Sequence, residues 1–162
     1  MTTSTNGVLA ASPASSRRPL LAIGVGGLIV GALDLLYAIV VYSPRHPALI
    51  PQIIASGLLG RQSFQDGNAS VALGFVLQFV IALGAATVYY LVSRKLKFLV
   101  HRAILCGMAY GALVFIFMHL VVLPLSAAPL GHMTFVHAAT EFVQHWFVVG
   151  LPISLSVRHY AP

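Results

Sequence analysis

Four long apolar stretches alternate with short polar connections along the chain. They cover residues 20–42, 69–93, 103–123 and 134–156. Each is close to the roughly 20 residues that an α-helix needs to cross the hydrocarbon core of a bilayer. The pattern predicts an all-α integral membrane bundle of four transmembrane helices.

A fifth apolar stretch, residues 48–60, is too short to cross a bilayer as a helix. Gln52 and Ser56 interrupt it, which favours a short interfacial helix on the outer surface of the membrane. Residues 1–19 are rich in Thr, Ser, Ala and Pro and have no apolar periodicity, a composition typical of a disordered tail. We therefore expect one membrane domain over residues 20–158, preceded by this tail.

The composition supports a membrane location. Hydrophobic residues make up 59% of the chain and charged residues 7%, whereas a soluble domain carries roughly 25% charged residues because its surface must be hydrated. The net charge of +6 does not indicate nucleic-acid binding, since the basic residues are few and lie at the edges of the apolar stretches. The single cysteine, Cys106, excludes an intrachain disulfide and any site built from several thiolates.

Most basic residues fall on one side of the predicted bundle. Seven lie on that side: Arg17, Arg18, Arg94, Lys95, Lys97, Arg102 and Arg158. Only Arg45 and Arg61 lie on the other side. We expect the protein to lie in the inner (plasma) membrane of the cell. The positive-inside rule then predicts that both termini face the cytoplasm. The expected partners are membrane lipids, with a homo-oligomer or a larger membrane complex left open.

Six polar side chains interrupt the predicted spans, and nearly all of them fall in the outer half of the bilayer. They are Asp34, Gln78, His119, His137, Glu141 and His145. A buried carboxylate costs several kcal/mol unless it is paired or protonated, and no lysine or arginine lies inside a span. The histidines are therefore the expected partners, in a Glu141–His145 or an Asp34–His119 pair, with Gln78 in support.

The spacing of these residues suggests one shared cluster. His137, Glu141 and His145 recur every four residues, so a helix presents them on one face. Stripes of small residues, which let helices approach closely, run beside the other polar positions. These stripes are Gly27-x3-Gly31 before Asp34 and Gly107-x3-Gly111 before His119. If the glycines mark helix contacts, Asp34 and His119 point into the bundle.

Three interpretations of the cluster are open. Histidine titrates near neutral pH, so the cluster could handle protons or cations, or sense the pH of the outer compartment. Imidazole and carboxylate also bind metals, so a haem or metal site is the second interpretation, with His119, His137, Glu141 and His145 as candidate ligands. The third is a structural clamp in a non-catalytic accessory subunit. No catalytic motif such as Gly-x-Ser-x-Gly or a P-loop is recognisable.

Several short motifs together resemble a known family. The motifs are Pro44-Arg45-His46-Pro47 after the first span, Gly107-x3-Gly111 leading to His119 and Pro124-Leu125, and Glu141-x3-His145 followed by Trp146. In this combination the chain resembles the YagU-type family of small bacterial inner-membrane proteins, whose function is unknown. The resemblance covers roughly residues 20–158 and implies an inner-membrane location and a four-span layout.

Overall fold

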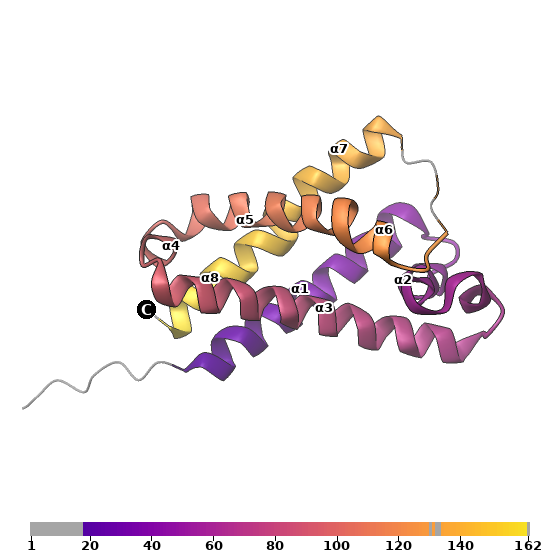
Figure 1. Ribbon diagram of the computed structural model, residues 1–162, viewed down its shortest axis with the longest axis horizontal. Coiled ribbons are helices and arrows are strands. Elements are labelled where there is room, and N and C mark those ends of the chain that lie inside the picture. Colours follow the sequence, from indigo (N-terminus) through magenta and orange to yellow (C-terminus); the bar gives the residue numbers. More distant parts are fainter. Residues whose placement is uncertain (1–17, 130, 132–133, 162) are drawn as a thin grey trace, which may run out of the picture.

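The computed structural model (Figure 1) describes residues 18–129, 131 and 134–161, and these residues form helices and short connections without any β-strand. The all-helical class predicted from the sequence is confirmed. Residues 1–17, most of the predicted N-terminal tail, lie outside the described residues. The first half of the chain contains α1 (Pro19–Tyr42), α2 (Leu49–Leu59), the 3-10 turn η1 (Gly60–Phe64) and α3 (Asn68–Lys95).

The second half of the chain contains two long helices, each interrupted by a π-helical segment. After the single turn α4 (Phe98–His101), the first runs through α5 (Ala103–Phe117), the π segment η2 (Met118–Val122) and α6 (Leu123–Leu125). The second runs through α7 (Phe135–Gln144), the π segment η3 (His145–Gly150) and α8 (Leu151–Tyr160). The third predicted span ends at residue 123, but the helix continues through Pro124 to Leu125 because the widened turn of η2 accommodates the proline ring.

Three helices are long and apolar enough to cross a membrane: Pro19–Tyr42, Asn68–Lys95 and Ala103–Leu125. They correspond to the first three predicted spans. The C-terminal helix over residues 135–160 is as long but is not among them. Four polar residues, His137, Glu141, Gln144 and His145, lower its mean hydropathy.

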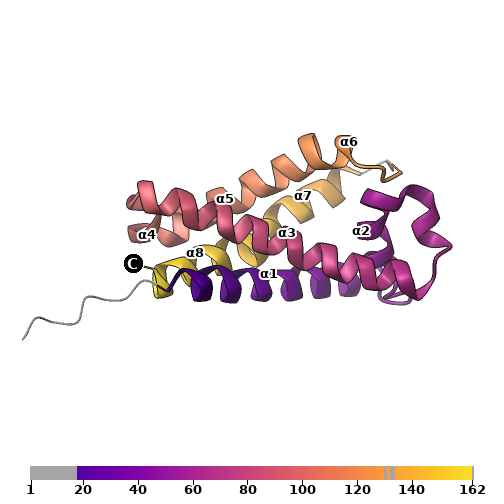
Figure 2. The ribbon, with the colours of Figure 1, turned by 60° about the horizontal axis from the view of Figure 1, so that its bottom comes forward.

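Helix α1 packs between α3 and α8, and α5 packs on the far side of the C-terminal helix (Figures 1 and 2). Glycines allow these contacts. A methyl group on Gly27 would lie 2.9 Å from the Cα of Leu83 in α3, and one on Gly26 would lie 3.2 Å from the Cβ of Ser156 in α8. Gly31 faces the ring of Phe79 in α3.

Helix α5 meets η3 backbone to backbone. An added Cβ on Gly107 would lie 2.9 Å from the carbonyl oxygen of Gly150, and one on Gly111 would lie 2.9 Å from the Cα of Trp146. On the other flank of the molecule, Gly74 of α3 contacts the backbone of Pro51, so α2 is packed against α3. These glycines bring the four long helices close enough for short polar side chains to meet.

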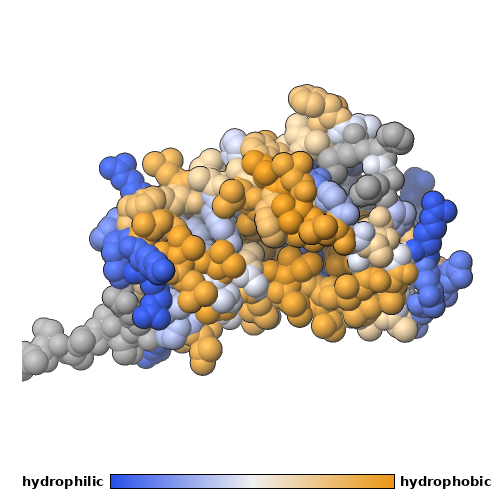
Figure 3. Space-filling view, viewed as in Figure 1, coloured by the Kyte–Doolittle hydropathy of each residue, from blue (hydrophilic) through white to orange (hydrophobic). Residues whose placement is uncertain are grey.

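The surface is apolar along most of its length. Large side chains such as Leu36, Val80 and Leu113 are exposed on the outer faces of α1, α3 and α5. Figure 3 shows hydrophobic residues over the middle of the molecule and hydrophilic ones gathered at its two ends. One end carries α4 with the start of α1 and the end of α8 (the α4 end), and the other carries α2 and η1 (the α2 end) (Figure 1). Arg18 and Tyr160 join at the α4 end, where the N–H of Arg18 donates to the Tyr160 carbonyl at 2.9 Å.

Candidate functional site

The carboxylate of Asp34 is held by two glutamine amides from different helices. Nε2 of Gln78 in α3 donates to Oδ2 at 2.9 Å, and Nε2 of Gln144 in α7 donates to Oδ1 at 2.7 Å. Both glutamines are buried. Each carboxylate oxygen thus receives a charge-assisted hydrogen bond, and the three side chains tie α1, α3 and α7 together. We call this group the Asp34 clasp.

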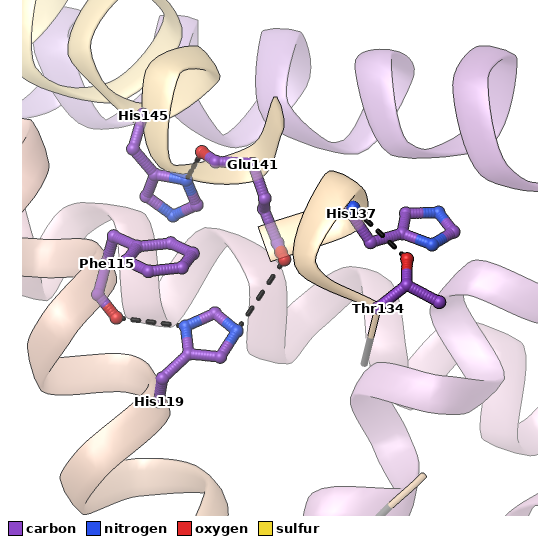
Figure 4. Close-up of polar contacts among 6 residues, drawn as sticks. All are labelled: Phe115, His119, Thr134, His137, Glu141 and His145. Carbon is purple, nitrogen blue, oxygen red and sulfur yellow. Dashed lines mark hydrogen bonds and ion pairs between the residues drawn. The ribbon is translucent and has the colours of Figure 1, made fainter. Parts of the chain in front are cut away.

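Glu141 pairs with His119 of the neighbouring helix. Its Oε2 lies 3.6 Å from Nε2 of His119 (Figure 4). The side chains of His119 and Glu141 are 20% and 30% exposed, so neither is fully enclosed by the protein. It connects η2 to α7.

His119 and His145 are oriented by the same kind of hydrogen bond. Nδ1 of His119 lies 3.0 Å from the carbonyl oxygen of Phe115, and Nδ1 of His145 lies 2.8 Å from that of Glu141. A carbonyl oxygen can only accept, so each Nδ1 carries a hydrogen and Nε2 of the neutral ring is an acceptor. The Phe115 ring lies between the two imidazoles, with centroids 4.1 Å from His119 and 5.4 Å from His145 (Figure 4).

Because of this orientation, the His119–Glu141 contact depends on whether the pair carries a proton. A neutral His119 would direct the lone pair of Nε2 at an ionised carboxylate, and that contact is repulsive. A proton on either Nε2 or the carboxylate makes the contact attractive. The pair therefore holds η2 and α7 together when it carries a proton and loses that attraction when the proton leaves.

The histidine–carboxylate pairs expected from the sequence are not the ones that form. Asp34 accepts from glutamine amides and not from His119. His145 donates to the backbone carbonyl of Glu141 and not to its carboxylate. Gln144 was missed by the sequence analysis, although its place three residues after Glu141 puts it one helical turn away.

His137 lies apart from the pair. Its ring is exposed and packs on that of Tyr42 with a centroid distance of 4.8 Å. Its backbone N–H donates to Oγ1 of Thr134 at 3.3 Å, which caps the start of α7. The Tyr42 hydroxyl is buried and has no hydrogen-bond partner among the described residues.

Prolines account for the π segments that hold both histidines. His119 lies in η2, which ends two residues before Pro124, and His145 lies in η3, which ends two residues before Pro152. Proline lacks an N–H and its ring clashes with the carbonyl four residues earlier, which falls inside η2 or η3. A wider π turn relieves that clash, and such turns are frequent at functional sites.

Replacing Pro152 with alanine is expected to convert η3 into regular α-helix, because alanine restores the N–H and removes the clash. The residues of η3 would then rotate relative to α5. Trp146 is the only tryptophan of the chain, so its fluorescence emission maximum should shift. Pro44→Ala, in the connection after α1, is the matched control and should leave the emission unchanged. An unshifted spectrum in Pro152→Ala would show that the proline does not determine the π turn.

The side chains proposed as metal ligands make separate contacts and do not converge on one point. Among residues 18–129, 131 and 134–161, no three His, Cys, Asp or Glu side chains are grouped closely enough to hold a metal ion. Only His119 and Glu141 of the candidate set bring their side chains together. The described side chains therefore give the metal interpretation no assembled set of ligands.

Comparison with known proteins gives no relative from which to transfer a function. No protein-family model, curated protein or solved structure matches the chain. The chemistry of the site must therefore be argued from its own residues.

Proposed function

We propose that this chain is an inner-membrane protein of four spans that responds to extracytoplasmic pH through the His119–Glu141 pair. The observation that carries the proposal is the hydrogen bond from Nδ1 of His119 to the Phe115 carbonyl. It leaves Nε2 facing the Glu141 carboxylate, so the contact between two long helices depends on one proton.

Several features support a membrane-spanning bundle that includes the C-terminal helix. Three helices have the length and hydropathy of spans. The polar side chains of the fourth turn toward its neighbours, since Gln144 donates to Asp34 and Glu141 contacts His119. A membrane interior requires this internal satisfaction of polar groups, because lipid offers no hydrogen-bonding partner.

The distribution of charge supports an orientation with both termini in the cytoplasm. The described basic residues at the α4 end are Arg18, Arg94, Lys95, Lys97, Arg102 and Arg158, whereas Arg45 and Arg61 belong to the connections at the α2 end. The positive-inside rule assigns the more basic side to the cytoplasm. The His119–Glu141 pair and the Asp34 clasp then lie in the extracytoplasmic half.

A sensor fits the chain better than a proton conduit. Toward the α4 end, the C-terminal helix offers Ser154 and Ser156 as hydroxyl groups. Both are buried and donate to backbone carbonyls, Ser154 to Leu151 at 3.0 Å and Ser156 to Ala22 at 2.8 Å. Between His145 and Arg158 the C-terminal helix thus carries no titratable side chain.

The proposal is tested by measuring the distance between η2 and α7 as a function of pH. Spin labels on two exposed positions, Leu120 and Val136, in protein reconstituted into liposomes should report a distance that differs between samples at about pH 5 and about pH 8. Glu141→Gln should abolish the change, because a glutamine amide can donate to Nε2 at every pH.

The matched control is Asp66→Asn, which removes the carboxylate of the connection before α3. This variant should keep the wild-type pH response. A response that survives in Glu141→Gln, or that disappears in Asp66→Asn, would contradict the assignment of the sensor to the His119–Glu141 pair.

A further inference from the structure

The α4 end of the molecule carries positive charge without any acid to neutralise it. The chain has three acids, and they lie in α1 (Asp34), in the connection before α3 (Asp66) and in α7 (Glu141). The described residues form one ion pair, His119 with Glu141. Anions that neutralise the basic side chains of the α4 end must therefore come from outside the chain.

Three of these basic side chains line a single shallow pocket. Lys97 and His101 come from the turn of α4 and Arg158 comes from the end of α8, with Val100 as the apolar part of the lining. The pocket has a volume of about 260 Å³. On its other side, Arg158 also borders a more open hollow with His159 and Leu155.

The two elements that form the pocket are fixed in place. Leu99 of α4 is buried in the core, and its carbonyl accepts a hydrogen bond from the Tyr89 hydroxyl at 3.2 Å. Val157, next to Arg158, is fully buried. The charged side chains thus extend from anchored backbone, which keeps Lys97 and Arg158 on the same part of the surface.

We propose that this pocket binds the phosphodiester headgroup of an anionic phospholipid. Lys97 and Arg158 supply the positive charge and the donors that a phosphate oxygen requires. A lipid is favoured over a soluble phosphate because Val100 adds an apolar side chain to the pocket and Leu155 adds one to the hollow that shares Arg158. Its lining residues belong to the α4 end, one of the two hydrophilic ends that border the hydrophobic middle of the molecule (Figure 3). This assignment extends beyond the pH response, since it concerns the opposite end of the molecule.

The test uses native mass spectrometry of the purified full chain in a neutral detergent. Phosphatidylglycerol is added in one series and phosphatidylcholine in a second. The wild type should retain phosphatidylglycerol in preference to phosphatidylcholine. The double variant Lys97→Gln with Arg158→Gln should bind phosphatidylglycerol about 25-fold more weakly, from about fivefold for each basic residue at an anionic lipid surface. Both side chains are exposed, so the variant should fold.

The control is Arg45→Gln with Arg61→Gln, which removes the same charge from the α2 end. It should keep wild-type affinity for phosphatidylglycerol. Undiminished binding in the double variant at the α4 end, or an equal loss in this control, would overturn the site. Displacement of the lipid by an equal concentration of glycerol 3-phosphate would overturn the lipid assignment and identify the ligand as a soluble phosphate. Neither result bears on the His119–Glu141 pair, so each proposal is tested independently of the other.

Discussion

Replacing Gly111 with alanine is expected to separate α5 from the C-terminal helix. The new Cβ would overlap the carbonyl group of His145 and approach the Cα of Trp146 at 2.9 Å. These are backbone atoms, which cannot rotate away as a flexible side chain would. The free energy of unfolding should therefore fall by about 3 kcal/mol, the upper end of the usual cost of overpacking. The His119–Glu141 contact should be lost as well.

Gly84 provides the matched control for this substitution. It lies within α3, and apart from its own stretch of helix backbone no atom lies within 4 Å of the position that its Cβ would take. Gly84→Ala should leave stability unchanged or raise it by up to about 1 kcal/mol, because alanine favours a helix more than glycine does. Thermal unfolding in detergent, followed by Trp146 fluorescence, compares the two variants. Equal stability of both would refute the close contact between α5 and η3.

Replacing Asp34 with alanine is expected to have the second largest effect. The amides of Gln78 and Gln144 are buried, and each would lose its charged acceptor. A hydrogen bond to a charged group contributes about 1.5–3 kcal/mol, although interhelical bonds in membranes contribute less. We therefore expect a loss of about 2–4 kcal/mol in the free energy of unfolding, measured by denaturant titration in mixed micelles.

Two further variants separate the loss of the clasp from the loss of a charge. Asp34→Asn keeps the size of the side chain and can still bond both glutamines if one of them turns its amide around, so it should recover most of the stability. Asp66→Ala removes a carboxylate outside the clasp and should have little effect. If Asp34→Ala proves as stable as Asp66→Ala, the two glutamine bonds contribute nothing to the fold.

The first three long helices could be predicted because hydropathy and length depend on composition alone. Residues 20–42, 69–93 and 103–123 agree with the helices Pro19–Tyr42, Asn68–Lys95 and Ala103–Leu125 to within a few residues. The polar residues of the last helix could be recognised as unusual for the same reason. Glu141 in this helix and Asp34 in α1 are conspicuous because each is an acid in an otherwise apolar stretch.

The partners of the two carboxylates could not be predicted, because they depend on how the helices cross. Gly107 and Gly150 let α5 and η3 touch through their backbones, and this contact determines which side chain reaches Glu141. The π segment η3 begins at His145, so the spacing of four residues no longer keeps side chains on one face from there on. Gln144 lies before that segment, in the regular helix α7, and its spacing alone does not identify Asp34 of α1 as its partner.

The Asp34 clasp also determines when the protein can finish folding. Asp34 and Gln144 lie 110 residues apart in the chain, so at about 5–20 residues per second a ribosome needs roughly 5–20 seconds between them. During that interval Asp34 can bond Gln78 alone, while the face of α1 that will receive α8 stays uncovered. The C-terminal helix is synthesised last, and its packing against α1 and α5 completes the fold.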